Sequence, residues 1–235
     1  MLSKSISFIV FLYVILPISI YGQSMPTDSL PDDPQYREDQ FYAGVTVNFL
    51  SGLPGDVEQS GFSGSARFGF LRDMPINKQR NLAIAIGAGL SFNTNNQNMK
   101  IDDDSGATTR FEQVSDEAYD SNRFSTYLIE IPLQFRWRTS TAKKNNFWRI
   151  YTGFKVGYLY SFKSKFRSEG QRINVKDPDG LERWRYSFTL SAGYGKVNFY
   201  LDYSLNNLFS GVNLEGSSTA VNIQPIKAGF IFYIL

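Results

Sequence analysis

The sequence contains neither cysteine nor histidine among its 235 residues. The first absence excludes a disulfide scaffold and a lipid-modified cysteine. The second absence removes the usual general base of serine hydrolases, so catalysis by a Ser-His arrangement is impossible. Nor do two carboxylates stand at a spacing typical of acid–base catalysis. We therefore predict that the protein is not an enzyme, with no catalytic residues and no cofactor.

Long apolar runs are also missing, apart from a short one at the N-terminus. The run from Ile6 to Ile20 is interrupted by Pro17 and is too short for a confident spanning helix. It follows a lysine and ends near a small residue, which predicts a signal peptide over residues 1–22, with an uncleaved anchor as the alternative. Residues 23–40 contain three prolines and several acids without periodicity, so we expect a flexible periplasmic leader.

An excess of charge of one sign is absent as well. The formal net charge is +2, with 24 Lys and Arg against 22 Asp and Glu. The sequence has no clustered basic stripe of the kind that binds nucleic acid. We therefore expect no nucleic-acid partner.

Aromatic residues are abundant, at 16% of the chain, and apolar residues alternate with polar or small ones in eight segments. Such a period of two is typical of strands. The connections alternate between shorter and longer, which is the pattern of an outer-membrane barrel. The eight segments are Phe41–Leu50, Gly64–Leu71, Asn81–Phe92, Phe124–Arg138, Phe147–Lys163, Arg183–Gly195, Lys196–Asn206 and Val221–Leu235.

These segments predict an all-β fold, an eight-stranded antiparallel up-and-down transmembrane β-barrel over residues 41–235. Without spanning helices, only a closed barrel satisfies its backbone polar groups in lipid. We expect an integral protein of the cell outer membrane, in contact with outer-membrane lipid, with long loops extracellular and both termini periplasmic. A soluble lipocalin-like barrel is the alternative, but its outer face should be rich in Lys and Glu.

The segment Phe124–Arg138 shows the two faces most clearly. One face carries Tyr127, Ile129, Ile131 and other apolar side chains, and the opposite face is mostly polar. We expect the apolar face to contact lipid, with Trp137, Trp148 and Trp184 in interfacial girdles. Pro132 cannot donate a ladder hydrogen bond, so we expect a bulge or local kink there.

The faces assigned to the lumen carry charges of both signs. Because eight strands leave little interior space, we predict a lumen charge network that plugs the barrel, formed by Arg67, Glu130, Arg136, Lys155, Arg185 and Asp202. Arg149, Lys196 and Lys227 also fall on these faces. The alternative is an anion-preferring pore, favoured by seven cations against two carboxylates.

The longest predicted loop, from Asn93 to Asn122, is strongly acidic. Loops carried on a rigid barrel often bind partners, so this one is a candidate partner-docking loop. A solvated acidic loop without a partner and a Ca²⁺ site at the three consecutive aspartates are the alternatives, although the spacing is not that of an EF-hand and we predict no metal site. The candidate residues are Asp102, Asp103, Asp104, Asp116 and Glu117.

Two motifs carry a resemblance to a known family. The stretch T-Y-L-I-E-I-P-L-Q-F-R-W-R, followed by W-R-I-Y-T-G-F-K-V-G-Y-L-Y, resembles the outer-membrane β-barrel family of Bacteroidetes. The early F-Y-A-G-V, the length and the long middle loop are most similar to the PorT family of the type IX secretion system. Leu235 departs from the family, since an aromatic residue commonly ends such barrels.

The resemblance implies a non-enzymatic barrel that supports protein secretion through the type IX secretion system, with other type IX secretion proteins as partners. Two other functions stay open from the residues alone. One is a small structural or adhesive barrel of the OmpX or OmpA kind, and the other is a small-solute pore.

Overall fold

The structure is a computed structural model that describes residues 39–103, 108–115, 119–139 and 148–234. The predicted signal peptide, nearly all of the predicted leader and Leu235 lie outside the described residues. Within the described ranges, no helix has the length and apolar character needed to cross a membrane.

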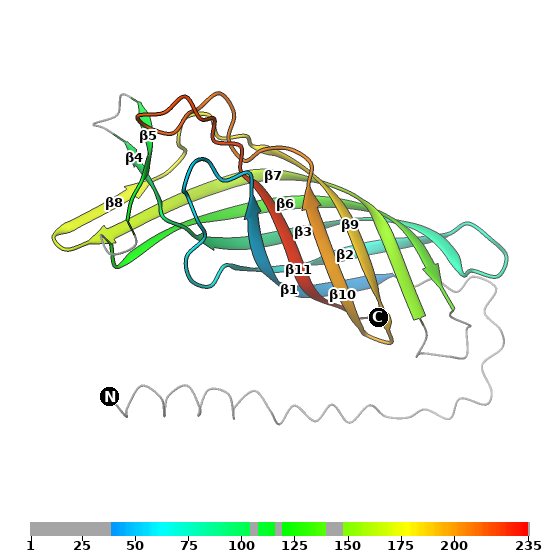
Figure 1. The fold of residues 1–235 in the computed structure, drawn as a ribbon. Helices are drawn as coiled ribbons and strands as arrows, with labels where there is room; N and C mark the ends of the chain where they lie inside the picture. The colour runs from blue at the N-terminus through cyan, green and yellow to red at the C-terminus, as the bar shows by residue number, and fades with distance from the viewer. Residues whose placement is uncertain (1–38, 104–107, 116–118, 140–147, 235) are drawn as a thin grey trace, which may run out of the picture. The chain divides into compact units, whose positions relative to one another are not determined.

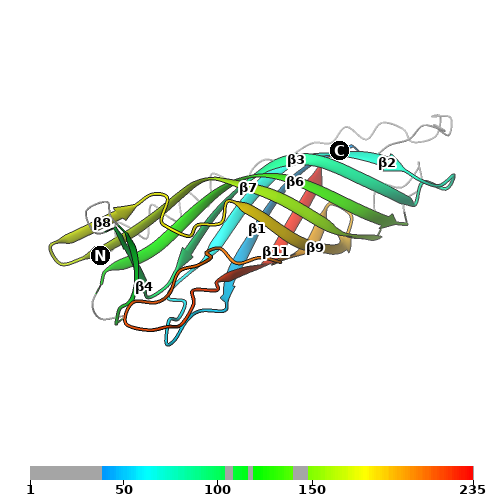
Figure 2. The same ribbon diagram turned by 90° about the horizontal axis from the view of Figure 1, so that it is seen from above.

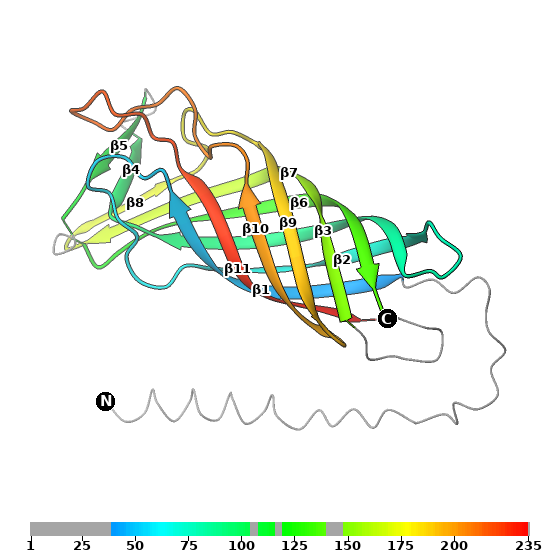
Figure 3. The same cartoon turned by 45° about the vertical axis from the view of Figure 1, so that its right-hand side comes forward.

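Eight strands close into an antiparallel barrel, as predicted (Figures 1 and 3). Around the barrel the order is β1, β2, β3, β6, β7, β9, β10 and β11, and β11 pairs back onto β1. Outside the barrel, β4 pairs with β5, and β8 pairs with the far end of β7. The bounds are β1 (Gln40–Ser51), β2 (Gly64–Pro75), β3 (Leu82–Asn96), β4 (Met99–Asp103), β5 (Thr109–Gln113), β6 (Ser121–Arg138), β7 (Trp148–Ser168), β8 (Gln171–Val175), β9 (Trp184–Tyr194), β10 (Val197–Ser204) and β11 (Gln224–Ile234).

The two ends of the barrel differ in their connections. At one end, which we call the turn end, β2 joins β3, β6 joins β7 and β9 joins β10 through short segments. At the other, the loop end, the connections are longer and contain β4, β5 and β8. Figure 2 shows β4 and β8 on the side away from the end of β11. The predicted alternation of short turns and long loops is therefore present.

Side chains alternate between the lumen and the outside along each barrel strand, because successive strand residues face opposite ways. On β1, Phe41, Val45 and Phe49 are exposed, whereas Tyr42 and Asn48 are buried. On β6 the exposed apolar row runs from Ile129 to Trp137 and Glu130 is buried. A continuous apolar band thus surrounds a polar lumen, which is the arrangement of a membrane barrel.

Aromatic side chains gather at both edges of the apolar band. From Tyr127 to Trp137, β6 spans about 33 Å along the strand, or about 23 Å in height at a tilt of about 45°. That height agrees with the roughly 25 Å band of outer-membrane barrels. The ring pairs are Trp148 with Tyr194 at the turn end, and Tyr158 with Trp184 and Tyr127 with Tyr160 at the loop end.

Small residues in the wall make room for large lumen side chains. Tyr42 is buried in the lumen, and its hydroxyl lies against Gly89 and Gly69 of the neighbouring strands. A Cβ atom at Gly89 would overlap this hydroxyl, and one at Gly69 would lie 2.6 Å from it. Glycine is therefore needed at these two positions, because the Tyr42 hydroxyl occupies the space that a side chain would fill.

A β-bulge in β7 reverses the faces of its last residues. Tyr127 of β6 pairs with Ser161, but the next residue pairs with Leu159, so Tyr160 is the extra residue. Beyond the bulge, Phe162 is buried and Lys163 is exposed. Strict alternation along the predicted segment Phe147–Lys163 places Phe162 outside and Lys163 inside, and this is wrong because alternation does not continue past an inserted residue.

The bulge that was one of the two expectations at Pro132 is absent, and that part of the prediction was wrong. The register between β6 and β7 is unchanged from Leu128 to Arg138, including the pair Pro132 and Lys155. The ladder between β6 and β3 instead lapses where Ile131 and Pro132 face β3, and it continues in the same register on both sides. The missing donor of the proline is accommodated by this interruption.

Candidate functional site: the lumen and the loop-end cap

Four charged side chains from four strands meet in the middle of the lumen. Arg67 on β2 pairs with Asp202 on β10, with 2.9 Å between Nη2 and Oδ2. Lys155 on β7 contacts the same carboxylate and also lies 2.9 Å from Oε1 of Glu130 on β6. All four side chains are almost completely buried. We call these residues the lumen network, and they link opposite walls of the barrel through ion pairs.

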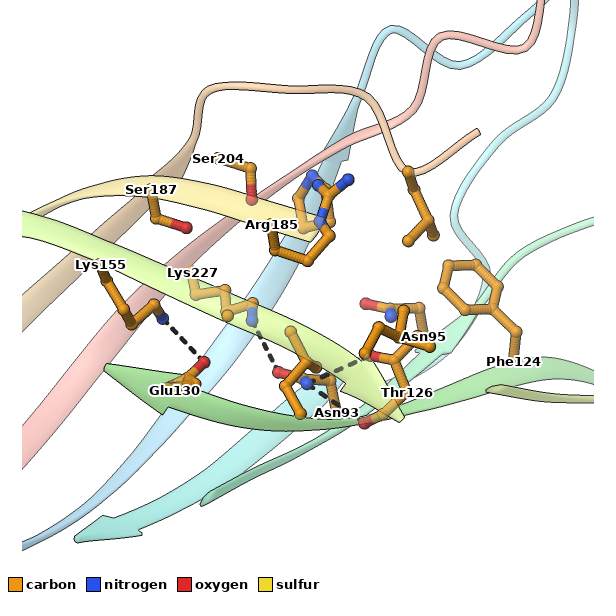
Figure 4. Close-up of a pocket in the computed structure, with 15 residues that line it drawn as sticks. Asn93, Asn95, Phe124, Thr126, Glu130, Lys155, Arg185, Ser187, Ser204 and Lys227 are labelled. Carbon is orange, nitrogen blue, oxygen red and sulfur yellow. Dashed lines mark hydrogen bonds and ion pairs between the residues drawn. The ribbon is translucent and has the colours of Figure 1, made fainter. Parts of the chain in front are cut away.

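Uncharged groups complete the lumen network. Ser91 donates a 2.8 Å hydrogen bond to Glu130, and the guanidinium of Arg67 donates to the Tyr200 hydroxyl and lies 4.4 Å from the ring centroid. Nearby, Lys227 donates a 2.7 Å bond to the Asn93 side chain, as Figure 4 shows beside the Lys155–Glu130 pair. The four charges of the lumen network are thus paired and also accept or donate hydrogen bonds, although Nε of Arg67 and Oδ1 of Asp202 have no hydrogen-bond partner among the described residues.

A second ionic cluster lies nearer the turn end, and its acid, Asp73, was not among the residues predicted from the sequence. Asp73 accepts a 2.9 Å bond from Arg136 and two bonds, of 3.0 and 2.9 Å, from the fork of Arg138. All three side chains are fully buried. The guanidinium of Arg136 also lies 4.7 Å from the centroid of the Tyr151 ring. We call Asp73, Arg136 and Arg138 the turn-end network.

Asp73 was not predicted as a lumen residue because the predicted strand ended at Leu71, whereas β2 continues to Pro75. The alternation of buried Leu71 and Asp73 with exposed Arg72 and Met74 was the available signal. Asp73 is therefore a third inward acid, besides Glu130 and Asp202, and Arg136 belongs to a cluster that the prediction had not separated.

The other predicted lumen cations have different surroundings. Arg185 is buried near the loop end and donates hydrogen bonds to the backbone carbonyls of Asn206 and Asn207. Arg149 is buried near the turn end and donates to the carbonyl of Gly195. Lys196 is exposed in the β9–β10 turn, so its inward placement was wrong. A turn residue has no fixed face, which is why alternation misplaced it.

Little empty space borders the lumen network. The cavity of Figure 4, lined by Asn93, Glu130, Lys155 and Lys227 among others, has a volume of about 20 Å³. A second cavity, beside Arg67 and Tyr200, has about 10 Å³. A single water molecule needs roughly 10–15 Å³ by this kind of measure. The spaces beside the network are therefore of the size of single water molecules.

The loop end is closed by the connecting segments, which we call the cap: residues 52–63, the described parts of 97–120, 169–183 and 205–223. The cap has a hydrophobic core that continues into the ends of the barrel strands, and apolar side chains from separate segments fill it. Its rings include Phe111 and Phe209, with centroids 5.0 Å apart. The buried core residues are Leu50, Val57, Met99, Ile101, Phe111, Phe124, Leu128, Leu159, Phe162, Val175, Leu208, Phe209, Leu214, Val221 and Ile223.

Hydrogen bonds join the cap segments to one another. Thr109 and Asp179 bond reciprocally, each accepting from the backbone N–H of the other at 2.9–3.0 Å. Phe111 accepts a 2.7 Å backbone bond from Glu215. Figure 3 shows the cap segments gathered at one end of the barrel. The long predicted loops therefore form a folded layer, held by packing and by backbone bonds.

Two of the five candidate docking residues lie in described parts of the cap. Asp102, on β4, is 3.0 Å from Lys100, and Asp103 is exposed. Burial disfavours the charged form of Lys100, but hydrogen bonds and charges from Asp102 and Glu112 outweigh it, so the pKa of Lys100 is raised. The described residues hold no group of three or more potential metal-ligating acids. The remaining candidates, Asp104, Asp116 and Glu117, lie outside the described residues.

Comparison with known proteins gives a family and similar solved structures. The family model of the outer membrane protein beta-barrel domain matches residues 22–210. No curated protein matches. Among solved structures, the crystal structure of Ail, the attachment invasion locus protein of Yersinia pestis, has a TM-score of 0.31 and 12% sequence identity, covering 83% of this chain and 97% of that chain. A likeness at that level carries no argument about function.

Proposed function

The chain belongs to the outer membrane protein beta-barrel domain family, and from this premise we propose that it is a closed, non-enzymatic barrel that acts through contacts made by its cap. Membership of the family places it in the outer membrane as an integral protein. The filled interior is the single observation that carries the proposal. Ion pairs cross the lumen at mid-height, and an apolar core covers it at the loop end.

The same observation argues against the small-solute pore. A conducting barrel needs a continuous aqueous path, and eight-stranded barrels have interiors that side chains fill. We expect no reproducible single-channel steps from the folded protein in planar bilayers. Stable conductance steps that disappear when Lys155 is replaced would contradict the closed-barrel proposal.

The orientation of the barrel follows the rule that long loops face the outside of the cell and short turns face the periplasm. Because the sequence lacks cysteine, single-cysteine variants give unique labels. Ser217→Cys in the cap and Lys78→Cys at the turn end are a matched pair, since both positions are exposed. An impermeant maleimide added to intact cells should label only the cap variant, and labelling of Lys78→Cys alone would reverse the orientation.

For the specific role, the resemblance of Phe124–Arg138 and the following strand to the PorT family supports participation in type IX protein secretion. A folded cap on a rigid barrel is a suitable docking surface for another envelope protein. Deleting the gene should then abolish secretion of type IX cargo proteins, and complementation with the wild-type chain should restore it. Unchanged secretion in the deletion strain would eliminate this role.

A structural or adhesive role in the manner of small OmpX-like barrels is the second candidate, and the folded cap favours it as well. The two roles differ in what the cap binds. Cross-linking from the Ser217→Cys position on living cells should capture secretion components in the first case and surface or host material in the second. The Lys78→Cys variant is the control, since it labels only neighbours of the turn end.

A further inference from the structure

A patch of exposed cations lies on the outer face of β6, β7 and β8, where these strands extend past the barrel towards the loop end (Figure 1). One of its residues lies on β6, and the other five fall between positions 163 and 176, on β7, on β8 and directly after β8. All are exposed. We call them the basic patch: Arg123, Lys163, Lys165, Arg167, Arg172 and Lys176.

The register places like charges directly opposite one another. Arg123 on β6 pairs with Lys165 on β7, and Arg167 on β7 pairs with Arg172 on β8. Like charges on facing strand positions destabilise a sheet, so these pairs do not contribute to the stability of the fold. Arg167 lies 3.9 Å from Asp120, and both side chains are more than half exposed, so this contact neutralises little of the charge. The patch thus retains a concentrated positive charge.

The patch forms a concave site. Ser121, Arg123, Lys165, Arg167, Arg172 and Asn174 line a depression of about 300 Å³ on this face. Arginine and lysine with neighbouring hydroxyl and amide groups are the donors that recognise phosphate oxygens. The opposite face of the same strands carries Phe124 and Phe162, which pack into the cap. The cations therefore lie on the side of these strands that faces away from the hydrophobic core of the cap.

The position of the basic patch relative to the apolar band indicates its ligand. On β7, exposed Tyr158 and Tyr160 mark the edge of the apolar band, and Lys163 follows directly, with its Nζ 5.4 Å from the ring centroid of Tyr127. Residues immediately beyond an aromatic girdle lie at the level of lipid headgroups. Clusters of Lys and Arg at that level bind anionic headgroups. We propose that the basic patch binds phosphate groups on lipids of the leaflet that meets the loop end.

The test uses the full chain, folded in neutral detergent micelles, with phosphorylated lipid A as the probe and the same lipid without its phosphates as the reference. The patch variant is Arg123→Gln with Lys165→Gln. The matched control is Lys78→Gln with Lys196→Gln, which removes two exposed cations from the turn end. Native mass spectrometry counts retained lipid, and thermal unfolding reports folding.

We expect wild type and control to retain the phosphorylated lipid, and the patch variant to retain it about tenfold less or worse, since each cation contributes a factor of roughly five near an anionic surface. Retention should fall with added salt, while inorganic phosphate should not displace the lipid. Without lipid, the patch variant should unfold at the same temperature as wild type or higher, because a repulsion has been removed.

Equal retention of lipid A with and without phosphates, or equal retention by patch and control variants, would overturn the proposal. Displacement by inorganic phosphate at equal concentration would show an anion site that does not need a lipid, and would also overturn it. Binding of a soluble acidic protein in preference to the lipid would assign the patch to a different partner. Conductance and secretion are not used, so failure here is distinguishable from failure of the proposed function.

Discussion

The lumen and the cap are both buried, but opposite kinds of side chain fill them. In the lumen, Arg67, Asp202 and Lys155 join opposite walls through charge. In the cap, Phe111, Phe209 and their neighbours exclude water with almost no charge. The lumen lies inside a wall whose outer face is already apolar, so its contents need not be apolar. The cap is made of connecting segments and needs an apolar core of its own.

Because of this difference, we expect substitutions in the two regions to destabilise the protein in different ways. A buried charge that has lost its partner destabilises the folded state as long as the barrel is closed. Damage to the lumen network should therefore lower the free energy of unfolding of the whole barrel. An apolar core that loses a side chain leaves a cavity, and a layer of connecting segments can open locally. The following substitutions test this contrast.

The largest effect should come from Glu130→Lys. It replaces the carboxylate beside Lys155 with a fourth cation, next to Lys155, Arg67 and Lys227, and breaking a buried pair typically costs about 3–5 kcal/mol even before repulsion is added. We expect a barrel that does not fold, or one that loses its heat-resistant mobility in gel electrophoresis. The control is Glu112→Lys, a charge reversal at a half-exposed acid of the cap, which should cost less than about 1 kcal/mol. Equal losses from both variants would contradict the plug.

Phe209→Ala should have the next largest effect. Phe209 is fully buried in the cap core against Phe111 and Phe162, and removing such a ring typically costs about 3–5 kcal/mol. Hydrogen exchange should rise in the cap segments, while the amides of β10 and β11 keep their protection. Loss of protection in β10 and β11 together with that of the cap segments would show that cap and barrel unfold as one cooperative unit.

Ile101→Val is a smaller change in the same core. Ile101 on β4 is fully buried, and loss of one methylene typically costs about 0.5–1.5 kcal/mol. Exchange protection of β4 and β5 should fall slightly, and that of the barrel strands should not change. An effect as large as that of Phe209→Ala would indicate that the β4–β5 pair anchors the cap.

The smallest effect is expected from Lys100→Gln. Lys100 contacts Asp102 and Glu112 at 3.0 and 3.2 Å on a partly exposed surface, where an ion pair contributes about 0.5 kcal/mol or less. Urea titration in neutral lipid vesicles should barely distinguish this variant from wild type. A loss above about 2 kcal/mol would mean that surface charge, besides the apolar core, holds the cap.

Much of the fold was predictable from the sequence, because alternation fixes which face each residue takes. The eight strands, the closed antiparallel order and the inward direction of Glu130 and Asp202 all followed from that period. What failed had a common cause. A bulge at Tyr160 and a strand extension to Asp73 depend on backbone pairing with neighbours, which local pattern does not encode.

The candidate site was predictable only in part. The charges of the lumen could be assigned to a face, but their partners could not, since pairs such as Arg67 with Asp202 join distant segments. The segments of the cap were predicted to be loops. Its core comes from short stretches around Ile101, Phe111 and Phe209, and these are too brief to show a periodic pattern of apolar residues. Tertiary packing, not local pattern, makes these stretches a structure.

The Arg67–Asp202 pair also bears on the order of assembly. Its members are 135 residues apart in the chain and sit on β2 and β10, which flank the pair β1 and β11 that closes the barrel. Until that seam forms, Arg67 and Asp202 lie near opposite edges of the open sheet, and the cations beside Asp202 are Lys227 on β11 and Lys155 on β7. Pairing of β1 with β11 brings Arg67 to Asp202, so the attraction between these two charges favours closure of this seam.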